Sequence, residues 1–384
     1  MNTKLVNWVE GMTVNHLHFQ QMENYFIDRL RDDLTGRLTA YNYGLLPSDG
    51  DRGNSDAFDI SQQLTGKVEI RLIRCNALTS GGYRISYNPP HGECLLYTHS
   101  FDADSKSPAS DKDILWDVIL SVEPYRRVPT GIPDEEETPP RHPDCTEHYS
   151  LSVVLKDTLN LKQMGLHHLV IGRIRQRGER YEVDNSHIPP CTSMNSHAEL
   201  LIYFEKFNKY LSDIERASMS IIAKIRNRTN NTSLANQVFR LCQEIIRHIS
   251  SIYFKFRNTG KYSAPIYIVD YCSTLAHTCF AALNFNSTAD KEEMLKYFYE
   301  WIGVTPGTFE EQLAETLGIL YDHENIRVIM FQAESFLATL SELLIKLSTL
   351  EYIGQHKENI VVAERWGQSQ QTKTDRGGGW NILG

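Results

Sequence analysis

The chain has 384 residues, of which 41% are hydrophobic and 23% are charged, and its formal net charge is -9. This composition is ordinary for folded protein and allows two or three domains. The negative net charge argues against nucleic-acid binding, because such binding normally needs a row of basic residues that releases counterions from the phosphates. We expect no signal peptide and no stretch approaching the roughly 20 apolar residues that span a bilayer. A cytoplasmic location follows.

The sequence offers no convincing catalytic or metal-binding motif. The seven cysteines are odd in number and contain no Cys-x-x-Cys pair, which favours free thiols over a disulfide framework. His16 and His18 would diverge on a helix, and the adjacent His167 and His168 would alternate faces on a strand, so neither pair has ligand spacing. Phosphate-loop and nucleophile-elbow patterns are also missing. We therefore expect no enzyme, no cofactor and no metal site.

Residues 1–40 are predicted to form an N-terminal segment and one amphipathic helix. The segment Thr13-Val14-Asn15 offers cap residues, and apolar residues then recur at roughly helical spacing, at Leu17, Met22, Phe26, Leu30 and Leu34. Two alternatives exist for this segment. Either the helix packs on the chain's own β domain, with Trp8 and Phe19 filling the core, or these residues bind a partner protein.

Residues 41–187 are predicted to form an antiparallel β-sandwich, because the pattern has a period of two and turn residues separate the runs. The clearest run is 67–72, where Val68, Ile70 and Leu72 face one side. Further strands are expected at 83–87, 95–97, 114–122, 151–155, 169–174 and 181–183. The acidic run 134–137 lies between prolines, and it is interpreted as a solvated loop.

Residues 188–355 are predicted to form a helical bundle, since Pro189 and Pro190 end the β region and helical spacing follows. The first helix should begin with a capping box of Ser196 and Glu199. Further helices are expected at about 234–256, 265–283, 292–301, from a cap at Thr308, and at 323–353. The apolar arc of the second helix is wide enough for intramolecular neighbours or for copies around a symmetry axis. We predict a trimer or bundle core of Leu234, Val238, Phe239, Leu241, Cys242, Ile245, Ile246 and Ile249.

Residues 356–384 are predicted to form a flexible tail. The segment is polar and glycine-rich before an apolar tip of Trp380, Ile382 and Leu383. The tip is a candidate docking peptide, and the alternative is a frayed terminus without a role.

Three stretches, in this order, look like one family: Val6-Asn7-Trp8-Val9-Glu10-Gly11-Met12 followed by His18-Phe19-Gln20-Gln21, then Ile188-Pro189-Pro190-Cys191, then Tyr321-Asp322-His323-Glu324-Asn325. Together they resemble the type VI secretion baseplate subunit family TssK. The set spans about residues 6 to 353, nearly the whole chain. One departure is His16-Leu17, where the family has Pro-Gln, so the local turn is expected to differ.

The resemblance implies a non-enzymatic, trimeric baseplate adaptor of an α+β fold, with a shoulder akin to phage receptor-binding proteins and a helical neck. It implies docking on the wedge proteins TssF and TssG, and we expect the contact at Trp8, Glu10, Gly11, Met12, His18 and Phe19. The family also has a C-terminal head that binds TssL and TssM. We expect that head to be absent here and the membrane link to be made differently. The alternative function is a trimeric phage-tail-like receptor-binding protein.

Overall fold

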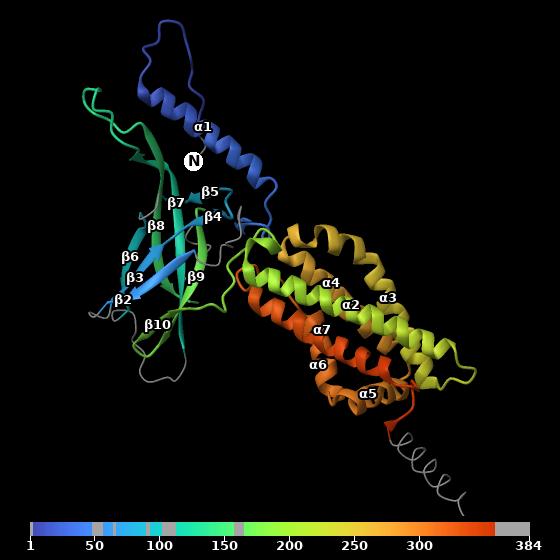
Figure 1. Ribbon diagram of the computed structural model, residues 1–384. Coiled ribbons are helices and arrows are strands. Elements are labelled where there is room, and N and C mark those ends of the chain that lie inside the picture. Colours follow the sequence, from blue (N-terminus) through green and yellow to red (C-terminus); the bar gives the residue numbers. More distant parts are fainter. Residues whose placement is uncertain are drawn as a thin grey trace, which may run out of the picture. The chain divides into compact units, whose positions relative to one another are not determined.

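The computed structural model describes residues 3–47, 57–63, 67–89, 93–101, 113–156 and 165–357. The chain divides into two compact units (Figure 1). Unit 1 comprises Met1–Phe204, Thr259–Ile268 and Tyr321–Ile329, and unit 2 comprises Glu205–Asn258, Val269–Leu320 and Met330–Gly384. The predicted docking tip, Trp380, Ile382 and Leu383, lies outside the described residues.

Unit 1 contains helix α1 (His16–Thr35) and three antiparallel sheets. The largest sheet has the order β10-β9-β7-β8, and its strands are β7 (Ile114–Thr130), β8 (Asp144–Leu155), β9 (His168–Arg177) and β10 (Arg180–Val183). The second has the order β2-β3-β6, formed by Phe58–Gln62, Lys67–Leu72 and Leu95–Ser100. The third has the order β1-β4-β5, formed by Gly44–Leu45, Cys75–Leu78 and Arg84–Tyr87. The prediction of antiparallel sheets after an N-terminal helix is confirmed.

The period of two in β3 reflects burial of one face. Val68, Ile70 and Leu72 are fully buried, whereas Lys67 and Arg71 on the other face are exposed. Strand β3 pairs with β2 and with β6, so its apolar side chains lie at the centre of the second sheet.

The second and the largest sheet share a core. Phe58 of β2 lies so close to β9 that a Cβ atom on Gly172 would come within 2.2 Å of its ring. Phe101, directly after β6, meets Trp116 of β7 edge to face, with ring centroids 4.7 Å apart. These contacts join strands that lie far apart in the sequence.

Strands β7 and β8 are much longer than the predicted runs 114–122 and 151–155. Beyond Val122 the two strands continue as a hairpin whose residues are mostly exposed or half-buried. Without a buried face the alternating pattern disappears, so no strand pattern marks this part of the sequence. The acidic run 134–137 lies at the largely exposed hairpin tip.

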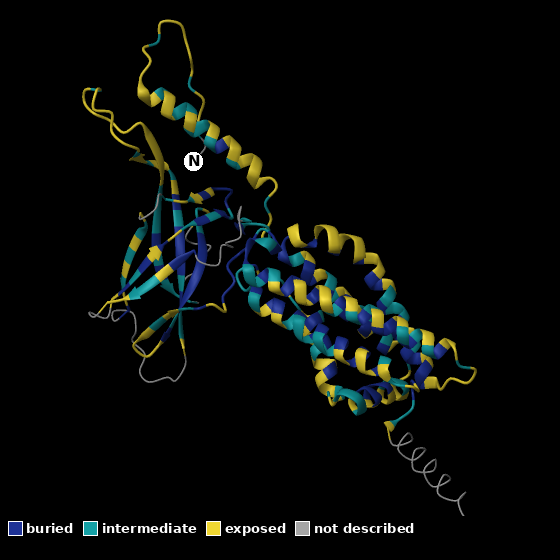
Figure 2. Cartoon of the chain, in the orientation of Figure 1, coloured by how far each residue is buried: buried dark blue, intermediate teal, exposed yellow. Residues whose placement is uncertain are grey.

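Six α-helices follow β10 in the described residues: α2 (Ala198–Arg226), α3 (Ser233–Thr259), α4 (Pro265–Asn284), α5 (Thr288–Ile302), α6 (Pro306–Leu317) and α7 (Ile326–Thr349). Each predicted helical segment is present. Their buried residues lie on the inward faces and their exposed residues on the outward faces (Figure 2), as expected for amphipathic helices around a common core.

Two predicted caps are wrong. Ser196 lies in a short 3-10 turn, and the ring of His197 accepts the backbone N–H of Glu199 at 3.2 Å in its place. Thr305 caps α6 because its side chain accepts the N–H of Thr308, also at 3.2 Å. Both segments contain several neighbouring cap-forming residues, so the pattern located the helix start only to within a few positions.

Two helices, Pro265–Asn284 and Ile326–Thr349, are long and apolar enough to cross a membrane by length and composition alone. The expectation that no stretch approaches such a composition is therefore wrong. Of their most apolar windows, 39% and 50% is buried inside the protein. In α7 fully buried side chains recur at Phe336, Leu340, Leu343 and Leu347, which is the spacing of a core-facing helix side.

Candidate partner-binding surface

Helix α1 begins at His16 because Asn15 caps it. The Asn15 side chain accepts the backbone N–H groups of Leu17 and His18 at 3.0 and 3.3 Å. In return, Nδ1 of His18 accepts the backbone N–H of Asn15 at 3.2 Å. This is a capping box in which histidine replaces the usual Glu or Gln. The cap predicted within Thr13-Val14-Asn15 is therefore Asn15.

The segment before α1 lies along the helix. The side-chain amide of Gln21 donates to the carbonyl of Lys4 at 2.8 Å, and the backbone N–H of Thr3 donates to the carboxylate of Asp28 at 2.8 Å. These bonds tie the start of the described chain to the middle of α1. The N-terminal segment and the helix therefore form one structural element.

A turn at Glu10 and Gly11 lets the chain reverse between the segment and the helix. Gly11 has a φ of 77°, a left-handed conformation that glycine adopts without steric strain. The ring of Trp8 then comes within 6.0 Å of the His18 ring and 6.4 Å of the Phe19 ring, measured between centroids. Trp8, His18 and Phe19 thus form one aromatic corner at the start of α1.

Asp28 is the buried residue of α1, with 3% of its surface exposed. Tyr125 of β7 donates its hydroxyl hydrogen to the Asp28 carboxylate, as does the N–H of Thr3. Arg31 lies 3.2 Å from the same carboxylate and donates to the hydroxyl of Tyr83 at 2.6 Å. Burial alone would raise the pKa of Asp28, but these hydrogen bonds and the charge of Arg31 hold the pKa below its ordinary value.

A second polar contact fixes the same side of α1 to the β7–β8 hairpin. The guanidinium of Arg127 lies 2.6 Å from the Glu23 carboxylate and donates to the side chain of Asn24 at 3.2 Å. Asn24, Asp28 and Arg31 are three or four residues apart and share one face of the helix. Helix α1 is therefore held on the β-structure by its polar face.

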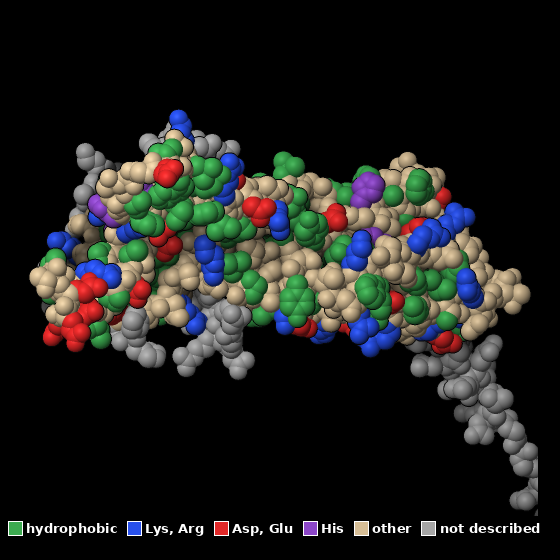
Figure 3. All heavy atoms as spheres, turned by 90° about the horizontal axis from the view of Figure 1, so that it is seen from above, with side chains coloured by type: hydrophobic (Ala, Val, Ile, Leu, Met, Phe, Trp, Pro, Cys, Tyr) green, Lys and Arg blue, Asp and Glu red, His purple; other side chains and the backbone are tan. Residues whose placement is uncertain are grey.

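Phe19, Phe26 and Leu30 lie on the side of α1 away from this docked face. Leu34 lies beside the turn between β4 and β5, where a Cβ atom on Gly82 would come within 3.6 Å of its Cβ. Phe19, Phe26, Leu30 and Leu34, here named the α1 apolar face, are 50%, 55%, 68% and 38% exposed. Phe26 and Leu30 are each two residues from Asp28, about 160° around the helix from the docked side. Figure 2 shows α1 as mostly exposed, and Figure 3 shows hydrophobic side chains gathered over the α1 end of unit 1.

Among the predicted wedge-binding residues, Trp8 is 48% exposed, Glu10 and Gly11 are exposed, and Met12 and His18 are half-buried. Trp8, His18 and Phe19 make up the aromatic corner, and Glu10, Gly11 and Met12 lie in the segment or turn beside it. The interpretation in which Trp8 and Phe19 fill the chain's own core is wrong, since both rings are about half exposed. The sequence reasoning missed the docking residues, and only the charged residues between the apolar positions hinted at them.

The other two motif stretches meet each other in unit 1, around Tyr43. The hydroxyl of Tyr43 donates to the Glu324 carboxylate at 2.5 Å. Leu45 donates its N–H to the carbonyl of Pro190 at 2.7 Å. Between them, Gly44 has a φ of 109°, and a Cβ atom there would lie 2.0 Å from the carbonyl oxygen of Pro190, so only glycine fits.

The hydrogen bonds of His323 fix its tautomer. Its Nε2 lies 2.8 Å from the carbonyl oxygen of Tyr43, which only accepts, so Nε2 carries the hydrogen. Its Nδ1 then accepts from the hydroxyl of Tyr321 at 2.9 Å. Burial lowers the pKa of His323 and raises the pKa of Glu324, so the ring is neutral at pH 7. These hydrogen bonds hold the residues next to strand β1 in place.

The described residues show no group of three or more His, Cys, Asp or Glu side chains that would hold a metal ion. The seven cysteines are free, and five are buried. Burial raises the pKa of Cys75 and Cys242 to about 12, so these thiols stay protonated and unreactive at neutral pH.

The predicted trimer or bundle core on α3 is buried in part by the chain itself. Six of its side chains are at most 3% exposed, namely Leu234, Val238, Leu241, Cys242, Ile245 and Ile249. Phe239 and Ile246 are half-buried, and Tyr253 further along is 46% exposed. The apolar arc therefore extends beyond the part that the chain covers.

No family model and no curated protein match the sequence. Among solved structures, a crystal structure of TssK aligns with a TM-score of 0.52 and 16% identity, over 88% of this chain and 69% of that chain. A chain of the type VI secretion baseplate complex aligns with a TM-score of 0.51 and 14% identity, over 90% and 100%. A chain of the TssK-TssF-TssG baseplate subcomplex aligns with a TM-score of 0.49 and 14% identity, over 89% and 99%.

Likeness at such low identity concerns the fold, and in the first two structures it extends over 88% and 90% of this chain. The chain therefore has a TssK-like fold, carried by a strongly diverged sequence.

Proposed function

We propose that this chain is a structural, non-enzymatic baseplate subunit of a type VI secretion system, acting on the cytoplasmic side as an adaptor. In this role the α1 apolar face and the aromatic corner at Trp8 dock on the wedge proteins TssF and TssG. The TssK-like fold supports the role, and the motif resemblance names the partners. The observation that carries the proposal is the outward direction of the α1 apolar face.

The exposed face has no function within unit 1. Docking of α1 depends on Asp28, Arg31 and Arg127. The side chains of Phe19, Phe26 and Leu30 remain at least half exposed and do not contribute to that docking. Contiguous exposed apolar surface of this kind usually marks an interaction site. Aromatic anchors such as Phe19 and Phe26 are also typical of interface hot spots.

The free energy gained by burying the α1 apolar face is large enough to anchor an interface. Complete burial of one large apolar side chain contributes roughly 1.5–3 kcal/mol. With about half of each side chain still exposed, covering the α1 apolar face would contribute on the order of 3–6 kcal/mol before the entropy cost of association. The neighbouring exposed residues Leu5, Trp8 and Val9 extend the same contact. An interface of useful affinity therefore needs both the helix and the segment.

The adaptor is proposed to act as a homotrimer. The side chains of Phe239 and Ile246, seven residues apart, flank the buried side of α3 and are only half-buried. Further copies of the chain would cover this edge. Light scattering should then give three times the chain mass of 44.1 kDa.

Phe239→Asp should dissociate the trimer, because burying an unpaired carboxylate costs several kcal/mol. The neighbouring Arg240, which is exposed, provides a matched control, and Arg240→Asp should leave the trimer intact. A wild-type monomer at micromolar concentration would contradict the trimer while leaving the wedge contact untouched.

Co-purification with TssF and TssG from the same host tests the wedge contact. The double variant Phe26→Asp/Leu30→Asp should lose both partners, because two charges would have to be buried in the interface. Gln20→Asp adds a charge at an exposed position of α1 outside the apolar face and should keep them. Equal recovery with all three proteins would contradict the proposal. Binding to cell-surface sugar without TssF and TssG would favour the receptor-binding alternative.

A further inference from the structure

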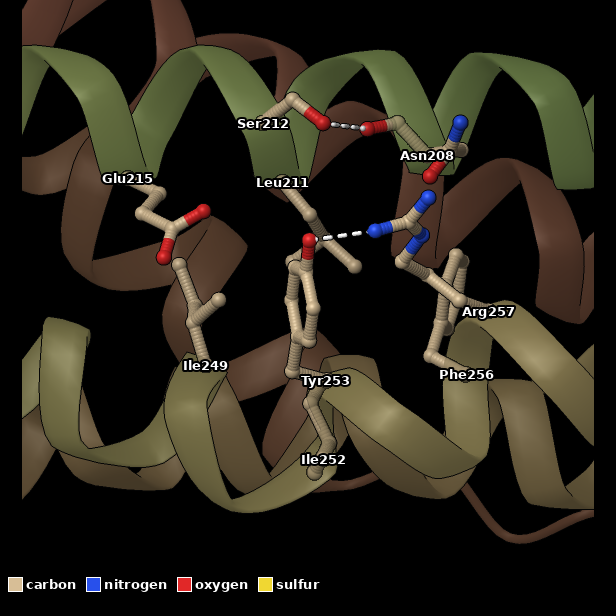
Figure 4. A pocket seen from close by; sticks show the side chains of 9 residues that line it. All are labelled: Asn208, Leu211, Ser212, Glu215, Ile249, Ile252, Tyr253, Phe256 and Arg257. Atoms are coloured by element: carbon tan, nitrogen blue, oxygen red, sulfur yellow. Dashed lines mark hydrogen bonds between the residues drawn. The ribbon is translucent and has the colours of Figure 1, made fainter.

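Unit 2 has a groove of about 290 Å³ between helices α2 and α3. Figure 4 shows the side chains that point into it from both helices. The volume lies near the lower end of the range for small-molecule pockets, which suits one large side chain and its neighbours better than a whole drug-sized ligand. The groove lies entirely within unit 2, whereas the residues assigned to the wedge contact belong to unit 1.

The floor of the groove is apolar and its rim is polar. Leu211 of α2 and Ile249, Ile252 and Phe256 of α3 contribute hydrophobic side chains that are buried or nearly so. The rim is formed by Asn208, Ser212, Glu215, Tyr253 and Arg257. An apolar floor with a hydrogen-bonding rim is the arrangement of grooves that take short peptides with hydrophobic anchors.

Tyr253 and Arg257 form the most specific part of the rim. The Arg257 guanidinium donates to the Tyr253 hydroxyl and lies 5.1 Å from the centre of the Tyr253 ring. A cation held beside an apolar floor favours an aromatic ligand side chain, and tryptophan gives the strongest cation–π attraction.

We propose that the groove receives the apolar tip of this chain's own C-terminal tail, with Trp380 as the anchor and Ile382 and Leu383 beside it. The tip combines an indole with two aliphatic side chains, which matches the floor and the Arg257 rim. Burial of three such side chains contributes roughly 1.5–3 kcal/mol each before ordering costs.

The tail is long enough for its tip to reach the groove. Gly354 is fixed at the start of α3, where its carbonyl accepts the Thr232 hydroxyl at 3.2 Å. From Ser233 the groove residues Ile249 and Arg257 lie 16 and 24 positions along the helix, or about 24 to 36 Å. The 22 residues from 358 to 379 separate Lys357 from the tip. A random coil of that length has a root-mean-square span of about 25 Å.

A match between linker span and site distance gives the highest local concentration of the tethered peptide, which is of the order of 1 mM for short linkers. A tip with a dissociation constant of about 0.1 mM would then occupy its own groove roughly nine-tenths of the time. Weak intrinsic affinity is therefore sufficient for docking within one chain.

Disulfide trapping tests the docking in the full chain. Ser212→Cys at the rim and Ile382→Cys in the tip are combined in a Cys94→Ser/Cys145→Ser background, which removes the two cysteines that are not buried. The pair should oxidise within one chain, and adding Trp380→Ala should slow the reaction at least tenfold. Non-reducing electrophoresis and peptide mass spectrometry identify the product.

The control pair is Arg240→Cys with Ile382→Cys. Arg240 is exposed on α3, only about 10 Å from the start of that helix. An undocked tail would therefore meet it at least as often as it meets Ser212 of α2. Docking predicts at least tenfold faster trapping at Ser212. Equal rates at the two positions would overturn the proposal. A two-chain product would do so as well, because the tip would then occupy a neighbouring copy, and no product would show that something else covers the groove.

Discussion

Helices α1 and α7 share the same amphipathic spacing, but α7 buries its apolar side chains and α1 exposes most of them to solvent. Phe336 and Leu340 of α7 are fully buried, whereas Phe26 and Leu30 of α1 are more than half exposed. The difference lies in the surface that each helix meets. Helix α1 meets Tyr125 and the other polar groups of β7, which select its charged side. The orientation of an amphipathic helix is thus decided by its neighbours as well as by its own pattern.

The largest expected effect on stability comes from replacing one phenylalanine by alanine in α7, and the same replacement in α1 is the comparison. Phe336→Ala should lower the free energy of unfolding by roughly 3–5 kcal/mol, because it leaves a cavity in a packed core. Phe26→Ala should change it by less than about 0.5 kcal/mol, since the ring already faces water. Urea unfolding followed by circular dichroism measures both. A loss of several kcal/mol for Phe26→Ala would mean that α1 packs by its apolar side after all.

An intermediate effect is expected where α1 is docked. Asp28→Ala would leave the Tyr125 hydroxyl and the Thr3 N–H without their acceptor, at a cost of about 1–3 kcal/mol. Faster hydrogen exchange of the α1 amides should report the loosening, with Asp33→Ala on the exposed side as the control. Unchanged exchange in Asp28→Ala would show that other contacts hold the helix.

The same carboxylate predicts a pH dependence. The pKa of Asp28 is lowered in the folded chain, so its contribution to stability is present above the ordinary aspartate value of about 3.9. The contribution is lost as the pH falls through the lower folded value. Acidification should therefore release α1 in the wild type, and Asp28→Asn should show a smaller change over the same acidic range. Identical acid profiles would contradict this assignment.

The smallest effect on stability is expected where Tyr43 contacts Glu324 and His323. Burial raises the pKa of Glu324, so stability falls as the pH rises from about 4.3 through the folded value. Glu324→Gln keeps an acceptor for Tyr43 and removes the buried charge. The variant should be at least as stable as the wild type at pH 7, and its stability should vary less with pH above about 4.3. A marked destabilisation at pH 7 would show that the charge itself is needed.

Local patterns predicted what depends on neighbouring residues. A cap within residues 13–15, the buried face of β3 and the helical segments all followed from spacing and propensity. The α1 docking did not, because Tyr125 and Asp28 are 97 positions apart, and Tyr43 and Glu324 are 281 apart. Both orientations of α1 fit the same amphipathic pattern, so the choice between them required the three-dimensional neighbours.

Hydroxyl-radical footprinting of the trimer or monomer in solution, with and without TssF and TssG, tests the central claim most directly. Phe19, Phe26 and Leu30 should be oxidised readily in the free protein and protected in the complex, whereas buried Phe336 should stay unreactive in both. Protection of Phe26 and Leu30 already in the free chain, or oxidation unchanged by the partners, would contradict the assignment of the α1 apolar face as the wedge-binding surface.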